Sequence, residues 1–170
     1  MPQLELSEHQ PAWPSQFADV AALLRPVLGP AMAIEHIGST AVPGLCAKPV
    51  LDVLLGADAL QAFDSRVESL AQLGFVYRPA YEDEVPDRRY FVRAADGALP
   101  RVHAHGVVRG GPLWRSHLQF RDLLRADAAV RETYAALKRQ LAQMHADDKA
   151  AYTLAKAPFI RQALEDGPAA

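Results

Sequence analysis

The most constraining feature of the sequence is a short apolar run, Val50 to Leu55, that contains one charged residue, Asp52. An almost continuously apolar run of this length is typical of a β-strand that is covered on both faces, and Gly56 ends it. Such a strand needs other layers around it, so we expect helices on the faces of a sheet. An aspartate inside the strand is costly unless it is paired, hydrogen-bonded or metal-bound, so Asp52 requires a partner.

Hydrophobic spacing and turn residues predict the other elements. Helices are expected over 14–28, from Asp58 to 73, over 114–125, from Asp127 to 144 and over 152–164, and strands over 32–37, 75–78, 89–93 and 101–108. Asp58 and Asp127 are expected to cap the helices that follow them, and Pro158 should kink the last helix or mark its start. The order predicts one α/β (α+β) domain over residues 1–170, with a mixed sheet of about five strands flanked by helices, and further helices at the C-terminus.

Composition narrows the function classes. The 170 residues are 50% hydrophobic and carry a formal net charge of −2, which is ordinary for a soluble domain. Because nucleic-acid binding relies on positive charge, we do not expect a nucleic-acid partner. A single cysteine, Cys46, excludes a disulfide framework and a thiolate zinc site. The sequence has no apolar run long enough for a membrane span, and its first ten residues include no lysine or arginine, so we expect a cytoplasmic protein without a membrane partner.

A turn of small residues, Gly38-Ser39-Thr40, follows the first predicted strand. Small residues let backbone N–H groups approach an anion closely, and a short helix beginning near Ser39 would add a favourable dipole. Lys48 lies just before the strand of Asp52. The turn and Lys48 therefore predict a site for a phosphate or another anionic group.

Two adjacent arginines, Arg88 and Arg89, begin another predicted strand and are expected to hold the same anionic group. Because neighbouring residues of a strand point to opposite faces, we expect only one of the two arginines to face the ligand cleft formed by the turn and Lys48. The other should be solvated or paired with a nearby acid. The acids closest in sequence are Asp83, Glu84 and Asp87.

A pair of histidines, His103 and His105, is spaced by two on a predicted strand, so both rings should point to one face. With Asp52 on an adjacent strand they would form a catalytic set and a two-histidine, one-carboxylate metal site, which suits zinc, iron, nickel or copper better than magnesium. Glu35 and Glu82 are the nearest further carboxylates. The alternative is a hydrogen-bonded polar cluster beside a ligand cleft.

Several motifs together point to one family. They are Trp13-Pro14, the segment HIGSTAVPGL with Ala47-Lys48-Pro49 and Asp52, Arg88-Arg89-Tyr90-Phe91, His103 and His105, Trp114-Arg115, His117-Leu118, Phe120-Arg121-Asp122, Leu124-Arg125, Tyr134, Leu137-Lys138, Tyr152 and Lys156. The chain resembles the GrpB family over nearly its whole length, and GrpB proteins look like members of the nucleotidyltransferase-fold superfamily. The resemblance implies a nucleotidyltransferase-like sheet and a nucleotide or other phosphorylated small ligand.

The sequence departs from the superfamily pattern at one position. In the superfamily, two carboxylates spaced by one residue hold divalent metal on the strand after the Gly-Ser turn, but the second position here is Leu54. Two hypotheses remain. One is a divergent nucleotidyltransferase-like enzyme that binds a phosphorylated ligand, with Asp52 as metal ligand or base. The other is a non-catalytic accessory or protein-interaction module that kept the fold and lost the two-carboxylate clamp.

Overall fold

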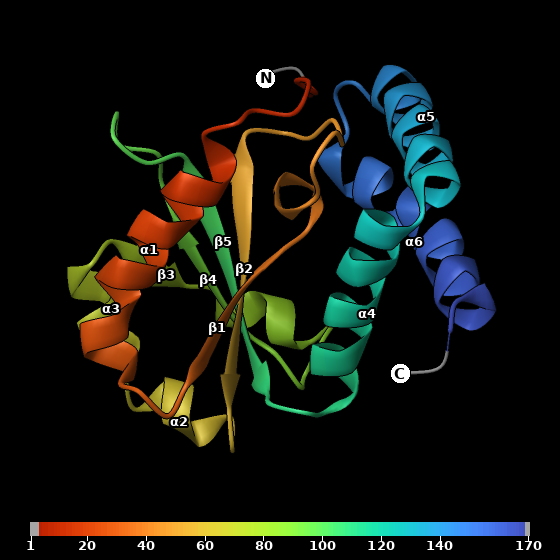
Figure 1. The fold of residues 1–170 in the computed structure, drawn as a ribbon. Helices are drawn as coiled ribbons and strands as arrows, with labels where there is room; N and C mark the ends of the chain where they lie inside the picture. Colours follow the sequence, from red (N-terminus) through yellow and green to blue (C-terminus); the bar gives the residue numbers. More distant parts are fainter. Residues whose placement is uncertain (1–3, 169–170) are drawn as a thin grey trace.

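The computed structural model describes residues 4–168 (Figure 1). The elements are α1 (Trp13–Leu28), β1 (Ala33–Ile37), the 3-10 turn η1 (Ser39–Ala41), β2 (Val50–Ala57), α2 (Gln61–Asp64), α3 (Val67–Gln72), β3 (Phe75–Tyr77), η2 (Pro79–Glu82), β4 (Arg89–Arg93), β5 (Arg101–Val108), α4 (Pro112–Ala126), α5 (Ala128–Met144) and α6 (Lys149–Asp166). The predicted order of helices and strands is confirmed, with one predicted helix broken in two. Within the described residues no helix is long and apolar enough to cross a membrane.

The five strands form one mixed sheet, as the sequence predicted, and their order in it is β1-β2-β5-β4-β3. The central pair, β2 and β5, is parallel, and the other pairs are antiparallel. In the parallel register Asp52 lies beside His103, and Leu54 lies beside His105. The pairing therefore brings the predicted aspartate and histidines together in the middle of the sheet.

Helices cover the two faces of the sheet differently (Figure 1). The first face carries the main core, in which Leu51, Val53 and Leu55 of β2 are buried with side chains of α1, α2 and α3. On the second face, Leu54 is fully buried and packs with Trp114 of α4. Because strand residues alternate between faces, Asp52 shares this second face with Leu54.

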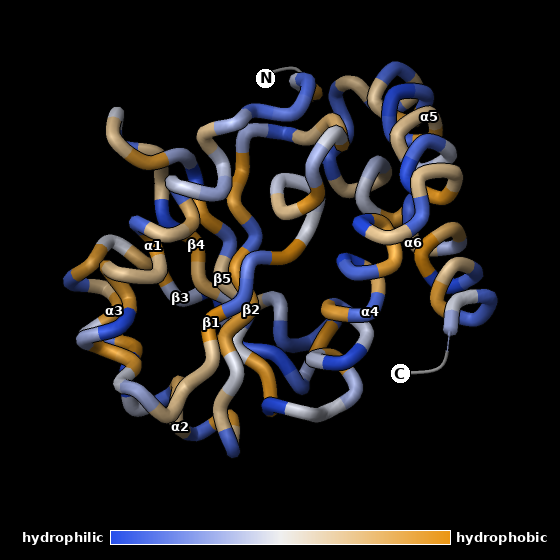
Figure 2. The backbone as a smooth tube through the Cα atoms, in the orientation of Figure 1, coloured by the Kyte–Doolittle hydropathy of each residue, from blue (hydrophilic) through white to orange (hydrophobic). Residues whose placement is uncertain are grey.

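The C-terminal helices pack onto α4 and onto the loop between β1 and β2. Val42 and Leu45 of that loop are buried with Leu124 of α4 and Tyr134 of α5. Hydrophilic and hydrophobic residues alternate along α5, as expected of a helix with one buried side (Figure 2). The loop is thus fixed between the sheet and the C-terminal helices.

The helix predicted after Asp58 is interrupted, and that prediction was wrong in two respects. The segment forms α2 and α3 with a break at Ser65 and Arg66, and Asp58 does not cap either helix within the described chain. The guanidinium of Arg66 donates to the carbonyl of Ala62 at 2.7 Å and to that of Val27 at 3.1 Å. Because an arginine from the break satisfies these carbonyls, the chain can turn there while Phe63 remains in the core.

The prediction for Asp127 is confirmed, because its carboxylate accepts hydrogen bonds from the backbone N–H of Ala129 and Val130 at 2.9 and 3.1 Å. The last helix begins earlier than predicted. Asp148 caps it by accepting from Ala151 N–H at 2.9 Å, and Pro158 lies inside the helix, not at its start.

Replacing Asp127 by alanine should lower the free energy of unfolding by about 1 kcal/mol, because two N–H groups of α5 lose their acceptor. Asp58→Ala is the matched control, since Asp58 caps nothing and only faces the exposed Arg109 at 3.4 Å. We expect that control to change stability by less than about 0.5 kcal/mol. Urea unfolding measures both, and equal losses would contradict the capping assignment.

Candidate functional site

The candidate site lies on the second face of the sheet, where Asp52 of β2 meets the histidines of β5. Asp52 Oδ1 is 3.2 Å from His105 Nε2 and 3.9 Å from His103 Nδ1. Burial raises the pKa of Asp52, but the hydrogen bond from His105 and the neighbouring positive charges outweigh it, and the net pKa is below the ordinary value. The Asp52 side chain is 34% exposed, so an ionised carboxylate faces the solvent here.

A hydrogen bond from Arg101 fixes the ring of His103. Arg101 Nε donates to His103 Nε2 at 3.0 Å, so the neutral ring carries its proton on Nδ1, the nitrogen that faces Asp52. Burial lowers the pKa of His103 to about 4, so the ring is neutral at pH 7. Asp52 and His105 are thus hydrogen-bonded to each other, and His103, which is bonded to Arg101, completes a polar cluster of the kind that the sequence left open as the alternative.

Aromatic rings surround this cluster. The ring of Tyr90 lies 5.7 Å from that of His103 and 5.3 Å from that of His105, and the guanidinium of Arg88 stacks over Tyr90 at 4.9 Å. His117 of α4 lies 5.8 Å from His105, and burial lowers the pKa of His117 to about 4. No spacing pattern in the sequence indicated His117 as a residue of this site.

The turn η1 contacts Asp52 through Gly38. Gly38 has φ +76°, and a Cβ at this position would lie 2.7 Å from Asp52 Oδ2. The hydroxyl of Ser39 accepts a hydrogen bond from Lys138 Nζ at 2.7 Å. The hydroxyl of Thr40 is instead hydrogen-bonded to His36 Nε2 at 2.9 Å. The Thr40 side chain is therefore paired with β1, and not with Asp52 or the histidines of β5.

Lysines from the C-terminal helices join Lys48 near the turn. Lys138 of α5 is 2% exposed, it also donates to the carbonyl of Cys46, and burial lowers its pKa to about 7. Lys48 and Lys156 lie over the ring of Tyr152 at 5.0 and 4.4 Å. Burial lowers the pKa of both lysines. The pKa of Lys156 falls to about 8, because the positive charge of Lys48 adds to the effect of burial. We call Lys48, Lys138 and Lys156 the lysine cluster.

The site residues predicted from sequence included Lys48 but not Lys138 and Lys156. Lys138 follows Tyr134 by four residues, and Lys156 follows Tyr152 by four, so each lysine lies on the buried side of its helix. A lysine at such a position is unusual, because lysines are rarely buried unless they are paired. That signal was present in the sequence.

Unsatisfied polar atoms gather around the same site. His105 Nδ1, Arg88 Nε and the hydroxyl of Tyr152 are buried and have no hydrogen-bond partner in the part of the chain that the structure describes. Buried polar groups nearly always have partners, so each of these atoms has room for a water molecule or a ligand group. The arrangement is that of a polar site able to form further hydrogen bonds.

The two arginines separate as predicted, and the structure decides which one faces the site. Tyr90 lies beside His105, whereas Arg89 lies beside Gly106 on the opposite face. Arg89 Nε donates to Asp64 at 2.6 Å, and its Nη1 lies 3.4 Å from Glu82. Assigning Arg89 to ligand binding was therefore wrong, because strand alternation turns it toward these two carboxylates, neither of which was among its expected partners.

The arrangement does not fit a metal centre. Within residues 4–168 no group of three or more histidine, cysteine or carboxylate side chains is positioned to hold a metal ion. Asp52 is already hydrogen-bonded to His105, His103 Nε2 accepts from Arg101, and Glu35 is paired with Arg121 at 2.7 Å. The divalent metal stays a prediction.

The fold has known counterparts. A structure of the Cid1 poly(U) polymerase with Mg and 3′-dATP bound matches 88% of this chain and 49% of that chain, with a TM-score of 0.58 and 13% identity. The architecture is thus nucleotidyltransferase-like, as predicted. The family model described as GrpB protein matches residues 3–166, and the chain belongs to the GrpB family.

Two relatives show how similar the family members are. The crystal structure of GrpB from Enterococcus faecalis has a TM-score of 0.82 and 34% identity, and the match covers 95% of this chain and 96% of that chain. The UPF0157 protein YqkA of Bacillus subtilis is 34% identical over 165 residues, which make up 96% of this chain and 47% of YqkA. The chain thus spans about half the length of YqkA.

Gly38→Ala should destabilise the protein more than an ordinary substitution at positive φ. A residue with a side chain at φ +76° and ψ −161°, a region that almost only glycine adopts, costs roughly 1–3 kcal/mol, and the contact with Asp52 adds to that. Gly44→Ala is the matched control, because Gly44 has φ +80° and a Cβ there meets no atom within 4 Å of the described chain.

Urea unfolding of both variants gives the difference. We expect Gly38→Ala to lose at least about 1 kcal/mol more than Gly44→Ala. The same loss in both variants would show that the turn does not press on Asp52.

Proposed function

We propose that the protein binds a nucleotide or another phosphorylated small molecule between the η1 turn, the lysine cluster and Asp52. The observation that carries the proposal is the convergence of Lys48, Lys138 and Lys156 from a loop and two helices beside the Gly-Ser turn. The cytoplasm, where nucleotides are made and used, is the proposed location.

Electrostatics supports a phosphorylated ligand. Burial lowers the pKa of Lys138 and Lys156, and repulsion from the neighbouring ammonium groups lowers it further. A phosphate would supply the missing negative charge and accept hydrogen bonds from the ammonium groups and the backbone of the turn. Arg88, whose Nε has no partner among the described residues, is a further donor for the same ligand.

Asp52 is suited to positioning a ligand. A general base works best when its pKa lies near the operating pH, and the pKa of Asp52 is below its ordinary value. An ionised carboxylate held by His105 is instead a strong acceptor for a ligand hydroxyl. We propose that Asp52 orients a hydroxyl of the ligand, and that the phosphate lies toward the lysines.

A second candidate function is a non-catalytic binding module, and one observation favours it. Leu54 stands where the superfamily has its second carboxylate, and it is fully buried in a cluster with Ile37 and Val107. This position is therefore part of the core beneath α4. A protein of this kind would bind the phosphorylated ligand without turning it over.

Binding should depend on the two lysines that flank Tyr152. In calorimetric titrations with a panel of nucleoside mono- and triphosphates, we expect at least one ligand to bind the wild type. Lys48→Ala/Lys156→Ala should weaken it at least about tenfold, because each charge-assisted hydrogen bond contributes roughly 1.5–3 kcal/mol. Arg161→Gln, an exposed cation on the same helix as Lys156, is the matched control and should bind normally.

Two further outcomes are informative. If no phosphorylated ligand binds the wild type, or if the double variant binds as well as the control, the proposal is wrong. Release of phosphate or pyrophosphate by the wild type but not by Asp52→Asn would favour the enzyme, whereas binding without release would favour the module.

The affinity for the same ligand should fall as the pH rises from 7 to 9. The ammonium form of Lys156 is the one that binds phosphate, and its pKa in the free protein is about 8, so above that pH a proton must be taken up on binding. Each such proton weakens binding by up to about tenfold per pH unit. Lys156→Arg, which stays charged throughout, should flatten the profile, and an unchanged slope in this variant would contradict the assignment.

A further inference from the structure

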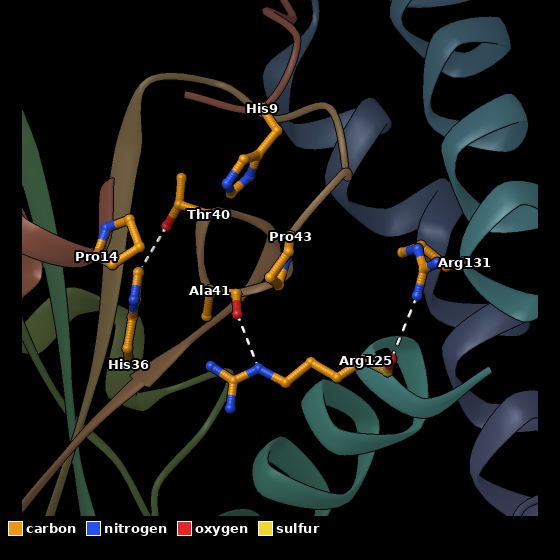
Figure 3. A pocket seen from close by; sticks show the side chains of 8 residues that line it. All are labelled: His9, Pro14, His36, Thr40, Ala41, Pro43, Arg125 and Arg131. Carbon is orange, nitrogen blue, oxygen red and sulfur yellow. Dashed lines mark hydrogen bonds between the residues drawn. The ribbon is translucent and has the colours of Figure 1, made fainter. Parts of the chain in front are cut away.

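A cavity separate from the Asp52 site opens at the β1 edge of the sheet, between α1, the loop after β1 and the end of α4 (Figure 3). Its volume is about 460 Å³, which is within the usual range for small-molecule pockets. The residues that line it are His9, Pro14, His36, Thr40, Ala41, Pro43, Arg125 and Arg131. None of them belongs to the lysine cluster or contacts Asp52 in the described structure.

Two arginines give the cavity a positive charge, and the described lining includes no carboxylate. Arg125 Nε donates to the carbonyl of Ala41 at 2.9 Å, and Arg131 Nη1 donates to those of Leu124 and Arg125 at 3.0 and 3.3 Å. These bonds fix both guanidinium groups. Their remaining nitrogens donate to no group in residues 4–168, and the carboxylate nearest to Arg125, that of Asp122, is 4.0 Å from its Nη1.

The opposite wall of the cavity is flat and uncharged. The ring of His36 is stacked on Phe17 at 4.6 Å, and burial, together with the charge of Arg125, lowers the pKa of His36 to about 4. Pro14 adds apolar surface next to His36, and Pro43 adds more beyond Ala41, toward Arg131 (Figure 3). His9 contributes an unsatisfied atom, because its Nδ1 is buried without a partner in the described chain.

We propose that this cavity is a second binding site, which takes a small organic oxyanion: a carboxylate or phosphate carried on a flat, mostly apolar body. The guanidinium groups of Arg125 and Arg131 lie at separate places in the lining (Figure 3), and each keeps N–H donors that no described group uses, so either one can bind a carboxylate or a phosphate. The body of the ligand packs against Pro14, His36 and Pro43. His9 Nδ1 gains a hydrogen-bond partner when the site is filled.

The two sites share a wall. Ser39 and Thr40 are consecutive in η1, but the first is bonded to Lys138 of the lysine cluster and the second to His36 of the cavity. The buried η1 turn therefore forms part of the wall of both sites, and each of the two hydroxyls serves one side.

The test uses the full chain with phenyl phosphate and benzoate as charged probes and benzyl alcohol as the uncharged control. In ¹H–¹⁵N spectra of the wild type, we expect at least one charged probe to shift the signals of Thr40, Ala41 and Arg131 at millimolar concentration, and benzyl alcohol to shift none of them. Arg125→Gln/Arg131→Gln should weaken this probe at least tenfold. Arg139→Gln, an exposed arginine of α5 outside the cavity, is the matched control.

A further pair of variants covers the case in which the double arginine variant fails to fold. Pro43→Glu breaks no hydrogen bond but adds a negative charge at the rim, so it should also weaken the charged probes at least tenfold. Lys48→Ala/Lys156→Ala should leave the shifts at Thr40 and Ala41 unchanged, which separates this site from the proposed phosphate site.

The proposal is overturned if neither charged probe shifts these signals, or if Pro43→Glu binds the charged probes as tightly as the wild type does. It is also overturned if Lys48→Ala/Lys156→Ala loses the shifts. Binding of phenyl phosphate alone, or of benzoate alone, supports the site and identifies which oxyanion it prefers.

Discussion

An ionised aspartate in an inner strand of the sheet, β2, is the constraint on which the surrounding structure depends. Asp52 lies between buried neighbours, so its charge needs compensation from groups within reach. His105 supplies a hydrogen bond from the parallel strand, and the positive φ of Gly38 lets the turn approach the carboxylate without a side chain between them. The pairing of β2 with β5 and the path of the chain into η1 thus both depend on the Asp52 carboxylate.

The C-terminal helices complete this site, in addition to burying apolar surface. Lys138 reaches from α5 to Ser39 and to the carbonyl of Cys46, and so ties the loop before β2 to the helical layer. A buried ammonium group is costly, and a well-packed apolar residue would hold the two layers together at a lower cost. The buried charge therefore costs stability, and the proposed phosphate beside Ser39 would compensate it.

Much of the fold followed from local patterns, because the strands and the long helices have strong periodicities and clear end signals. The boundaries of β4 and β5 and the cap at Asp127 are examples. The break at Arg66 depends on carbonyls of Ala62 and of Val27 in α1, a tertiary contact that no window of sequence contains. In the site, strand alternation correctly separated Arg88 from Arg89. Which of the two faces Asp52 depended on the register with β5, and Lys156 could be placed near Lys48 only once the helices were packed.

The missing second carboxylate has a structural counterpart on the neighbouring strand. Glu35 of β1 lies directly across from Leu54, on the same face of the sheet as Asp52. Its carboxylate is held at 2.7 Å by Arg121, which also donates to the carbonyl of His36 and so fixes α4 to the sheet edge. One acid is thereby committed to assembling the fold, and the other is left half-exposed beside the lysines. Any chemistry at this site must therefore rest on Asp52 and the cations around it, which favours recognition of a phosphorylated ligand over a mechanism that needs two carboxylates.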